Sequence, residues 1–216
     1  MSDPIRILWE GGSGEYEDRK SRFLADVRPV QSEEEALAFI ESIKKKYWDA
    51  RHHCYAYVIG DRGELMRCSD DGEPAQTAGR PMLDVLAGSG VRNLCVVVTR
   101  YFGGTLLGTG GLVRAYSTAC ARGLENSVII EKCPGREFQI LTDYSSIGRI
   151  LYLLERRSLK PHESSYTDRV ELKLMVPEGL TEELIRELTE ATSGQAQITP
   201  SDLVWYSLID GEVLIY

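Results

Sequence analysis

The sequence lacks the features of membrane proteins and disulfide-rich proteins. None of its uninterrupted apolar runs, such as Leu94 to Val98, approaches the roughly 20 residues of a membrane-spanning helix. Met1 to Pro4 also lack the basic and apolar stretches that open a secretory signal. The five cysteines are an odd number without a CxxC pair, which disfavours a disulfide framework. We therefore expect a cytoplasmic protein with reduced thiols and no membrane contact.

The chain has little positive charge, and what it has is local. Its 216 residues, enough for one large or two small domains, carry 25 Lys and Arg against 33 Asp and Glu. Between Ala75 and Leu124, however, the only acidic residue is Asp84. That stretch contains the following arginines: Arg80, Arg92, Arg100, Arg114 and Arg122. This balance excludes a general nucleic-acid coat but leaves one specific anion site open.

The first 134 residues alternate between strand and helix patterns. The expected strands are residues 5–9, 23–30, 54–59, 64–68 and 93–99. A polar connection is expected at 10–17. Helices are expected from Ser32, near Pro81 and from Gly111. Ser32 and Glu35 form a capping box, in which Glu35 is placed to reach back to the Ser32 amide.

The pattern restarts near Cys133, where we place a domain boundary. The second part has the order strand, helix, strand, strand, helix, strand. The corresponding elements are 138–142, a helix capped by Ser145, 163–167, 170–176, a helix after Thr181, and 204–209. This is the split βαβ order of a ferredoxin-like fold. The sequence therefore predicts an α+β protein with domains 1–134 and 135–216.

A glycine-rich segment follows the strand at 93–99 and precedes a helix. Its glycines are Gly103, Gly104, Gly108, Gly110 and Gly111. Glycine lets successive backbone N–H groups converge on an anion, and Arg100 and Arg114 could add bidentate contacts to phosphate. The segment matches neither a Walker A motif nor the GxGxxG fingerprint. The alternative is a tight loop that needs glycine for close packing.

A second unusual segment, Arg51 to Tyr57, places two histidines beside a thiol. His52, His53 and Cys54 raise the options of a metal site or a Cys/His nucleophile. Neighbouring strand residues point to opposite faces, so His52 shares a face with Cys54 and His53 does not. The simpler interpretation is a polar residue that orients a neighbouring loop.

A third segment, Ser69 to Pro81, is an acidic loop before a helix. Asp70, Asp71 and Glu73 could bind Mg²⁺ or perform acid–base chemistry. Alternatively, the aspartates cap a turn and Gly72 and Gly79 supply backbone freedom.

Together with Lys20 to Phe23, these three motifs closely resemble the IMPACT family, including its bacterial YigZ-like members. The resemblance is strong over residues 15–125 and weaker in the acidic tail. It implies a first domain like domain 2 of ribosomal protein S5 and a ferredoxin-like second domain, a pair similar to the last two domains of translocating elongation factors. Two departures are Leu106, where the family usually has Lys, and Arg51-His52-His53 in place of Thr-His-Asn. By its spacing to Cys54, His52 fills the family's histidine position.

The resemblance favours a non-enzymatic regulator of translation that binds RNA or a ribosome-associated partner, since eukaryotic IMPACT competes for a ribosome-associated activator of the amino-acid-starvation kinase. The alternatives are an enzyme or small-molecule binder that holds a phosphate-bearing ligand with the Asp70–Pro74 loop, and a protein-interaction module anchored by Tyr101 and Phe102. We expect no cofactor, no metal and no readout of DNA sequence. The candidate binding residues are His52, His53, Cys54, Asp70, Asp71, Glu73, Thr77, Arg100, Tyr101, Gly103, Gly104, Gly108, Gly110, Gly111 and Arg114.

Overall fold

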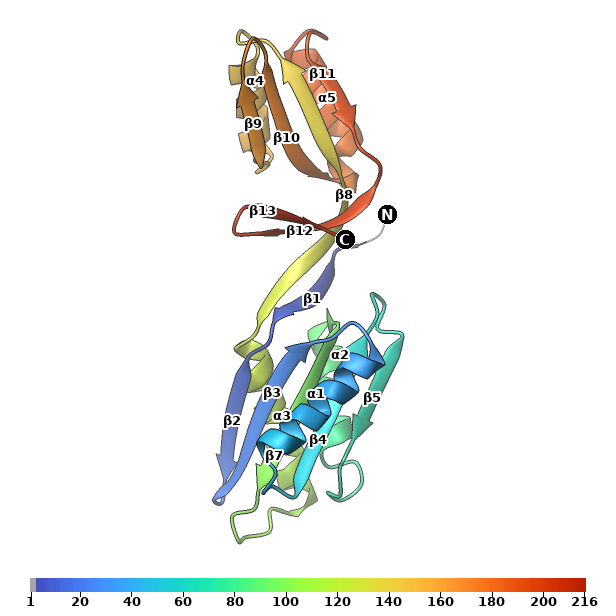
Figure 1. Ribbon diagram of the computed structural model, residues 1–216, viewed down its shortest axis with the longest axis vertical. Helices are drawn as coiled ribbons and strands as arrows, with labels where there is room; N and C mark the ends of the chain where they lie inside the picture. The colour runs from blue at the N-terminus through green and yellow to red at the C-terminus, as the bar shows by residue number, and fades with distance from the viewer. Residues whose placement is uncertain (1–2) are drawn as a thin grey trace. The chain divides into compact units, whose positions relative to one another are not determined.

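The computed structural model describes residues 3–216, so Met1 and Ser2 of the expected first domain lie outside it. The chain forms two compact units, Ile5–Ile130 and Glu131–Tyr216. Both units combine helices with a sheet (Figure 1), which confirms the expected α+β class. No helix within residues 3–216 is long and apolar enough to cross a membrane.

The first unit is built on an antiparallel sheet of five strands in the order β2-β3-β7-β4-β5. The strands are β2 (Ser13–Asp18), β3 (Ser21–Pro29), β4 (His52–Ile59), β5 (Leu65–Ser69) and β7 (Leu94–Tyr101). β7 lies at the centre, as its apolar sequence predicts. Two further strands, β1 (Ile5–Glu10) and β6 (Val91–Arg92), pair in parallel outside this sheet.

Helices cover both faces of this sheet (Figure 1). They are α1 (Glu33–Lys46) on one face, and α2 (Gly79–Ser89) and α3 (Gly108–Glu125) on the other. Strand β7 contributes to both cores, because Cys95 and Val97 pack with α1 whereas Val96 and Val98 pack with α2 and α3. Because Arg100 lies near the end of this strand, which is buried on both faces, its backbone is held at a fixed place.

Three local predictions for the first unit need correction. Residues expected as a polar connection form β2, whose side chains alternate between exposed and half-buried without a strong apolar signal. Ser32 does cap α1, but Glu35 accepts its hydrogen bond from the amide of Gln31, one residue earlier than expected, at 2.8 Å. Helix α3 begins at Gly108 rather than Gly111. The last difference puts Gly110 and Gly111 inside the helix.

The ferredoxin-like part of the second unit contains four antiparallel strands in the order β9-β10-β8-β11. Its elements are β8 (Val128–Thr142), α4 (Ile147–Arg156), β9 (Glu163–Tyr166), β10 (Val170–Pro177), the short 3₁₀ turn η1 (Glu178–Leu180), α5 (Thr181–Ala191) and β11 (Gln197–Pro200). Helices α4 and α5 cover one face and enclose an aliphatic core around Ile140, Leu154 and Leu172 (Figure 1). This connectivity is the expected ferredoxin-like order.

The strand that closes this fold was assigned wrongly from the sequence. β11 closes it, whereas the expected strand at 204–209 is β12 (Val204–Ile209), which forms a hairpin with β13 (Glu212–Ile215) beside the first part of β8. β11 is short and polar and carries Pro200, so its sequence gives little strand signal. The predicted cap of α4 is also wrong, because Asp143 rather than Ser145 accepts the amide of Ser146, at 2.9 Å.

Candidate functional site

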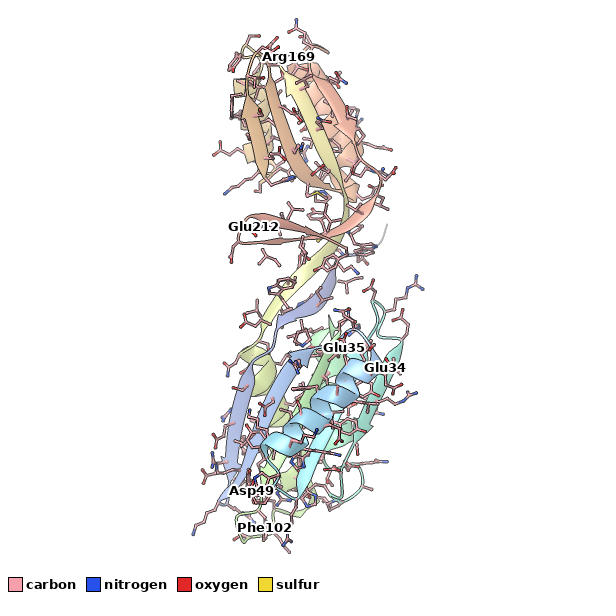
Figure 2. The ribbon with its side chains drawn as sticks, in the orientation of Figure 1. Glu34, Glu35, Asp49, Phe102, Arg169 and Glu212 are labelled. Carbon is pink, nitrogen blue, oxygen red and sulfur yellow. The ribbon has the colours of Figure 1, made fainter. Side chains whose placement is uncertain are left out.

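All three sequence motifs contribute to one cleft of about 820 Å³ in the first unit. The connection from α1 to β4 supplies Asp49 to His52, the loop before α2 supplies Glu73 and Pro74, and the end of β7 with the start of α3 supplies the third wall. Asp49 and Phe102 mark this end of the unit in Figure 2. The walls are not only polar, because Pro74, Phe102 and several leucines also line the cleft.

Glu73, Arg100 and Tyr116, which we call the buried triad, form the most buried polar group at the cleft. Arg100 donates from Nη1 to Glu73 Oε1 at 2.6 Å, and the Tyr116 hydroxyl donates to the same oxygen at 2.8 Å. The Arg100 and Glu73 side chains are 7% and 3% exposed. Burial raises the pKa of Tyr116 far above its ordinary value, so its hydroxyl stays protonated and remains a donor.

Two aromatic rings flank the Arg100 guanidinium. Its central carbon lies 5.4 Å from the ring centre of Phe23 and 5.6 Å from that of Phe102. Phe23 is fully buried and packs edge-on against Tyr116, whereas Phe102 is 55% exposed. Cation–π contacts of this kind stabilise a desolvated guanidinium. Phe102 was a candidate anchor for a protein partner, and the structure places it at the cleft in an exposed position.

Asp70 fixes the loop that delivers Glu73. Its carboxylate accepts the backbone amides of Gln76, Ala78 and Gly79 at 2.8 to 3.0 Å, and so satisfies donors at the start of α2. Thr77 is buried and its hydroxyl donates to the carbonyl of Pro74 at 2.6 Å. Asp70 and Thr77 therefore hold the loop rather than line the cleft.

Asp71 and His53 join the same loop to β4. The Asp71 carboxylate accepts the His53 amide at 2.7 Å, and the His53 ring contacts the carbonyl of Tyr47 through Nε2 at 3.0 Å. Asp71 adopts a left-handed backbone with φ of 40°, which the adjacent Gly72 continues. His53 is buried on the α1 side of the strand and does not line the cleft, as expected from the alternation of strand residues.

His52 and Cys54 lie on the other side of β4. His52 lines the cleft while its Nδ1 contacts the Asp71 carbonyl at 2.9 Å. Cys54 is fully buried, its thiol donates to the Asp70 carbonyl at 3.0 Å, and burial raises the pKa of that thiol. A thiol in this state does not form a thiolate near neutral pH, which disfavours a nucleophile. Within residues 3–216, no three His, Cys, Asp or Glu side chains gather to hold a metal ion.

The glycines of the glycine-rich segment after β7 serve different purposes. A Cβ on Gly103 would lie 2.1 Å from the carbonyl carbon of Lys20, so Gly103 permits close packing on the β2–β3 turn. Gly104 and Gly108 have positive φ angles of 84° and 72°, and Gly108 lines the cleft at the start of α3. Gly110 and Gly111 belong to the first turn of α3, where Gly111 is buried against Leu107.

The arginines between Ala75 and Leu124 do not form one basic patch. Arg80 pairs with Asp84 at 2.8 Å, Arg100 pairs with Glu73, and Arg122 donates to the backbone carbonyl of Glu15. Arg114 is exposed and does not line the cleft. The local positive charge in the sequence is therefore dispersed in space.

Some residues in or beside the cleft were not predicted as site residues. Tyr116 and Phe23 were assigned to a helix face and a strand, because their spacing is that of core residues. Asp49 accepts the hydroxyl of Tyr101 at 2.8 Å, a contact between segments that no sequence spacing reveals. The available signals for Tyr116 were its polar hydroxyl on a large aromatic ring and its position a few residues after the last glycine of the glycine-rich segment.

Comparison with known proteins places these features in a family. Residues 19–124 match the model of the Impact N-terminal domain, and residues 140–195 match a domain of unknown function, DUF1949. A crystal structure of a hypothetical protein is 37% identical to this chain, with a TM-score of 0.59, and the match covers 92% of this chain and 97% of that one.

Curated relatives extend the match over most of the chain. The IMPACT family member YvyE of Bacillus subtilis is 39% identical over 91% of this chain and 90% of its own length. YigZ of Escherichia coli is 40% identical over 84% of this chain and 90% of its own length. Protein IMPACT of Homo sapiens is 34% identical over 53% of this chain and 35% of its own length. With relatives this similar over both units, the chain belongs to the IMPACT family.

Proposed function

We propose that the protein is a non-enzymatic regulator of translation that binds a ribosome-associated protein through the cleft of its first unit. The observation that carries this proposal is that three motifs meet at one cleft while most of their reactive groups are already engaged. Family membership supports the link to translation, because eukaryotic IMPACT acts on a ribosome-associated activator.

The engaged groups argue against catalysis. Cys54 is buried with a raised pKa, and the Asp70 carboxylate accepts three backbone amides. A general base or nucleophile must be free to reach a substrate atom. His52 is the exception, since its ring lines the cleft, but its ring contacts the Asp71 carbonyl, and no carboxylate among residues 3–216 orients it as a base.

The surface around the cleft favours a protein partner over RNA. Phosphate recognition relies on clustered Lys and Arg, whereas the cleft is lined by two arginines, Arg51 and Arg100, of which Arg100 is paired with Glu73. By contrast, Phe102 and Leu106 line the cleft and expose 55% and 80% of their surface. Trp48, which precedes the lining residue Asp49 in the chain, is 81% exposed. Exposed aromatic residues beside a desolvated polar centre are typical anchors of protein interfaces.

Co-sedimentation of the full chain with ribosomes tests the proposal. We expect the wild-type chain to sediment with ribosomes carrying their associated proteins, and Phe102→Ala to weaken binding at least tenfold, as for an interface anchor. Leu208→Ala is the matched control, because Leu208 is 57% exposed in the second unit. Absence of co-sedimentation at low salt would contradict the proposal. Binding to salt-washed ribosomes or to free ribosomal RNA, with a steep dependence on salt, would assign the partner to RNA instead.

A further inference from the structure

The Arg100 side chain lines the cleft, and its guanidinium has unused N–H groups. It carries five N–H groups, but the hydrogen bond from Nη1 to Glu73 is its only one within residues 3–216. The Nε atom is buried without a partner, in a side chain that is 93% buried and lines the cleft. Nε and Nη2 together form one of the two planar forks with which arginine binds an oxyanion through two parallel hydrogen bonds. An unpaired buried donor of this kind is costly unless a ligand uses it.

From this geometry we infer that the cleft takes a carboxylate carried by an apolar segment of the partner protein, with the carboxylate paired to the N–H groups of Arg100 that Glu73 leaves unused. The inference rests on the proposed function, whose partner class it specifies. Phe102 lies over the guanidinium and is exposed, so its ring can pack against the incoming segment as well.

The start of α3 adds to the attraction for a negative group. Its N-cap position is occupied by Leu107, which supplies no side-chain acceptor, and Gly108 and Thr109 line the cleft. The first N–H groups of a helix have no partner within the helix, and the helix dipole makes this end positive. Arg100 and the helix start therefore border the same cleft.

The other residues that line the cleft determine whether a carboxylate or a phosphate fits it better. Pro74, Phe102, Leu106, Leu107 and Leu112 line the cleft and offer apolar surface. The charge of Arg100 is already shared with Glu73, so a dianionic phosphate would meet a second negative charge nearby. A carboxylate brings a single charge and, in a peptide, an adjacent apolar side chain. These two features favour an apolar carboxylate over a phosphate.

A matched pair of small probes tests the inference on the full chain. We expect N-acetyl-phenylalanine to shift the Arg100 Nε–H and Gly108–Thr109 amide resonances, with an affinity of about 1 mM for a ligand of this size. N-acetyl-phenylalaninamide, which lacks only the charge, should bind at least tenfold more weakly, and so should inorganic phosphate. N-acetyl-phenylalanyl-glutamate with an amidated C-terminus, whose only carboxylate is that of the glutamate side chain, distinguishes a side-chain carboxylate from a chain-terminal one. Equal shifts by the acid and the amide, or no shift by any carboxylate, would overturn the inference.

Charge changes at Leu106 provide a test that spares the buried triad. Leu106 is 80% exposed and lines the cleft, so its substitution leaves the core intact. Leu106→Lys should strengthen binding of the acid probe roughly threefold, and Leu106→Glu should weaken it by a similar factor, with little effect on the amide probe. Leu208→Lys and Leu208→Glu, in the second unit, should change neither. Equal effects of the Leu106 variants on both probes would contradict the inference.

The two experiments separate this inference from the proposed function. Carboxylate binding at Arg100 without ribosome co-sedimentation would leave the carboxylate site standing and remove its proposed partner. Co-sedimentation that depends on Phe102, combined with no carboxylate binding, would remove the inference and keep the proposed function.

Discussion

The two units bury different kinds of polar group. Within residues 3–216, the buried acidic, basic and imidazole side chains, Glu73, Arg100 and His53, all belong to the first unit. The second unit buries only hydroxyl groups, such as those of Thr142 and Thr192, around an aliphatic core. Buried charges cost folding free energy unless they are paired, and the unit that retains them is the one in which we propose a binding site.

The largest expected effect comes from breaking the buried pair. Glu73→Leu should lower the free energy of unfolding of the first unit by about 3–5 kcal/mol, because it leaves the Arg100 charge buried without a counter-charge. The double variant Glu73→Leu/Arg100→Met should recover most of this loss, since neither charge then remains. Hydrogen exchange measures the two units separately, through amides of β7 and of β10.

Amide protection in β10 serves as the internal control and should not change. A double variant as unstable as Glu73→Leu would show that the destabilisation comes from lost packing rather than from an unpaired charge.

A smaller effect is expected at two glycines of the glycine-rich segment. Gly103→Ala should destabilise the first unit by about 1–3 kcal/mol, because its Cβ would overlap the backbone of Lys20 and force it to move. Gly110→Ala is the matched control. No atom lies within 4 Å of a Cβ there, and alanine favours a helix by about 0.5–1 kcal/mol. Thermal unfolding of both variants measures the contrast, and equal destabilisation would refute the distinction between packing and open glycines.

The smallest effect concerns hydroxyls that lack partners. Thr99 in the first unit and Thr142 in the second are fully buried, and neither hydroxyl oxygen has a hydrogen-bond partner. Thr99→Val and Thr142→Val should each stabilise the protein by about 1 kcal/mol, because valine keeps the shape and removes an unpaired polar group. Urea denaturation with an unchanged slope measures the gain. Destabilisation by either variant would mean that the hydroxyl is satisfied, and the two units would then differ in hydroxyls as well as in charges.

The sequence predicted the fold well where apolar periodicity was strong. β7 was expected as a central strand because residues on both of its faces are apolar, and α1 was expected from its cap and stripe. β2 and β11 were missed because edge strands with polar sequences lack this signal. In the second unit the more apolar hairpin strand β12 was mistaken for the closing strand, since local composition does not reveal which strand pairs with the centre of β8.

The sequence indicated which three motifs hold the candidate site residues, but it did not predict the contacts between those residues. That Arg100 pairs with Glu73 follows from the return of the chain past β7, which residue spacing does not reveal. Likewise, Asp70 and Arg114 looked equally available in the sequence. In the structure Asp70 binds backbone amides and Arg114 lies away from the cleft. Which polar residues remain free depends on tertiary contacts, and these are not local.

The hydrogen bonds of Asp70 have a kinetic consequence. Because three amides bind its carboxylate, the segment that carries Glu73 is already ordered before a partner arrives. For the partner that we propose, we therefore expect no loss of affinity to loop ordering and an association rate set by diffusion and orientation rather than by a slow rearrangement.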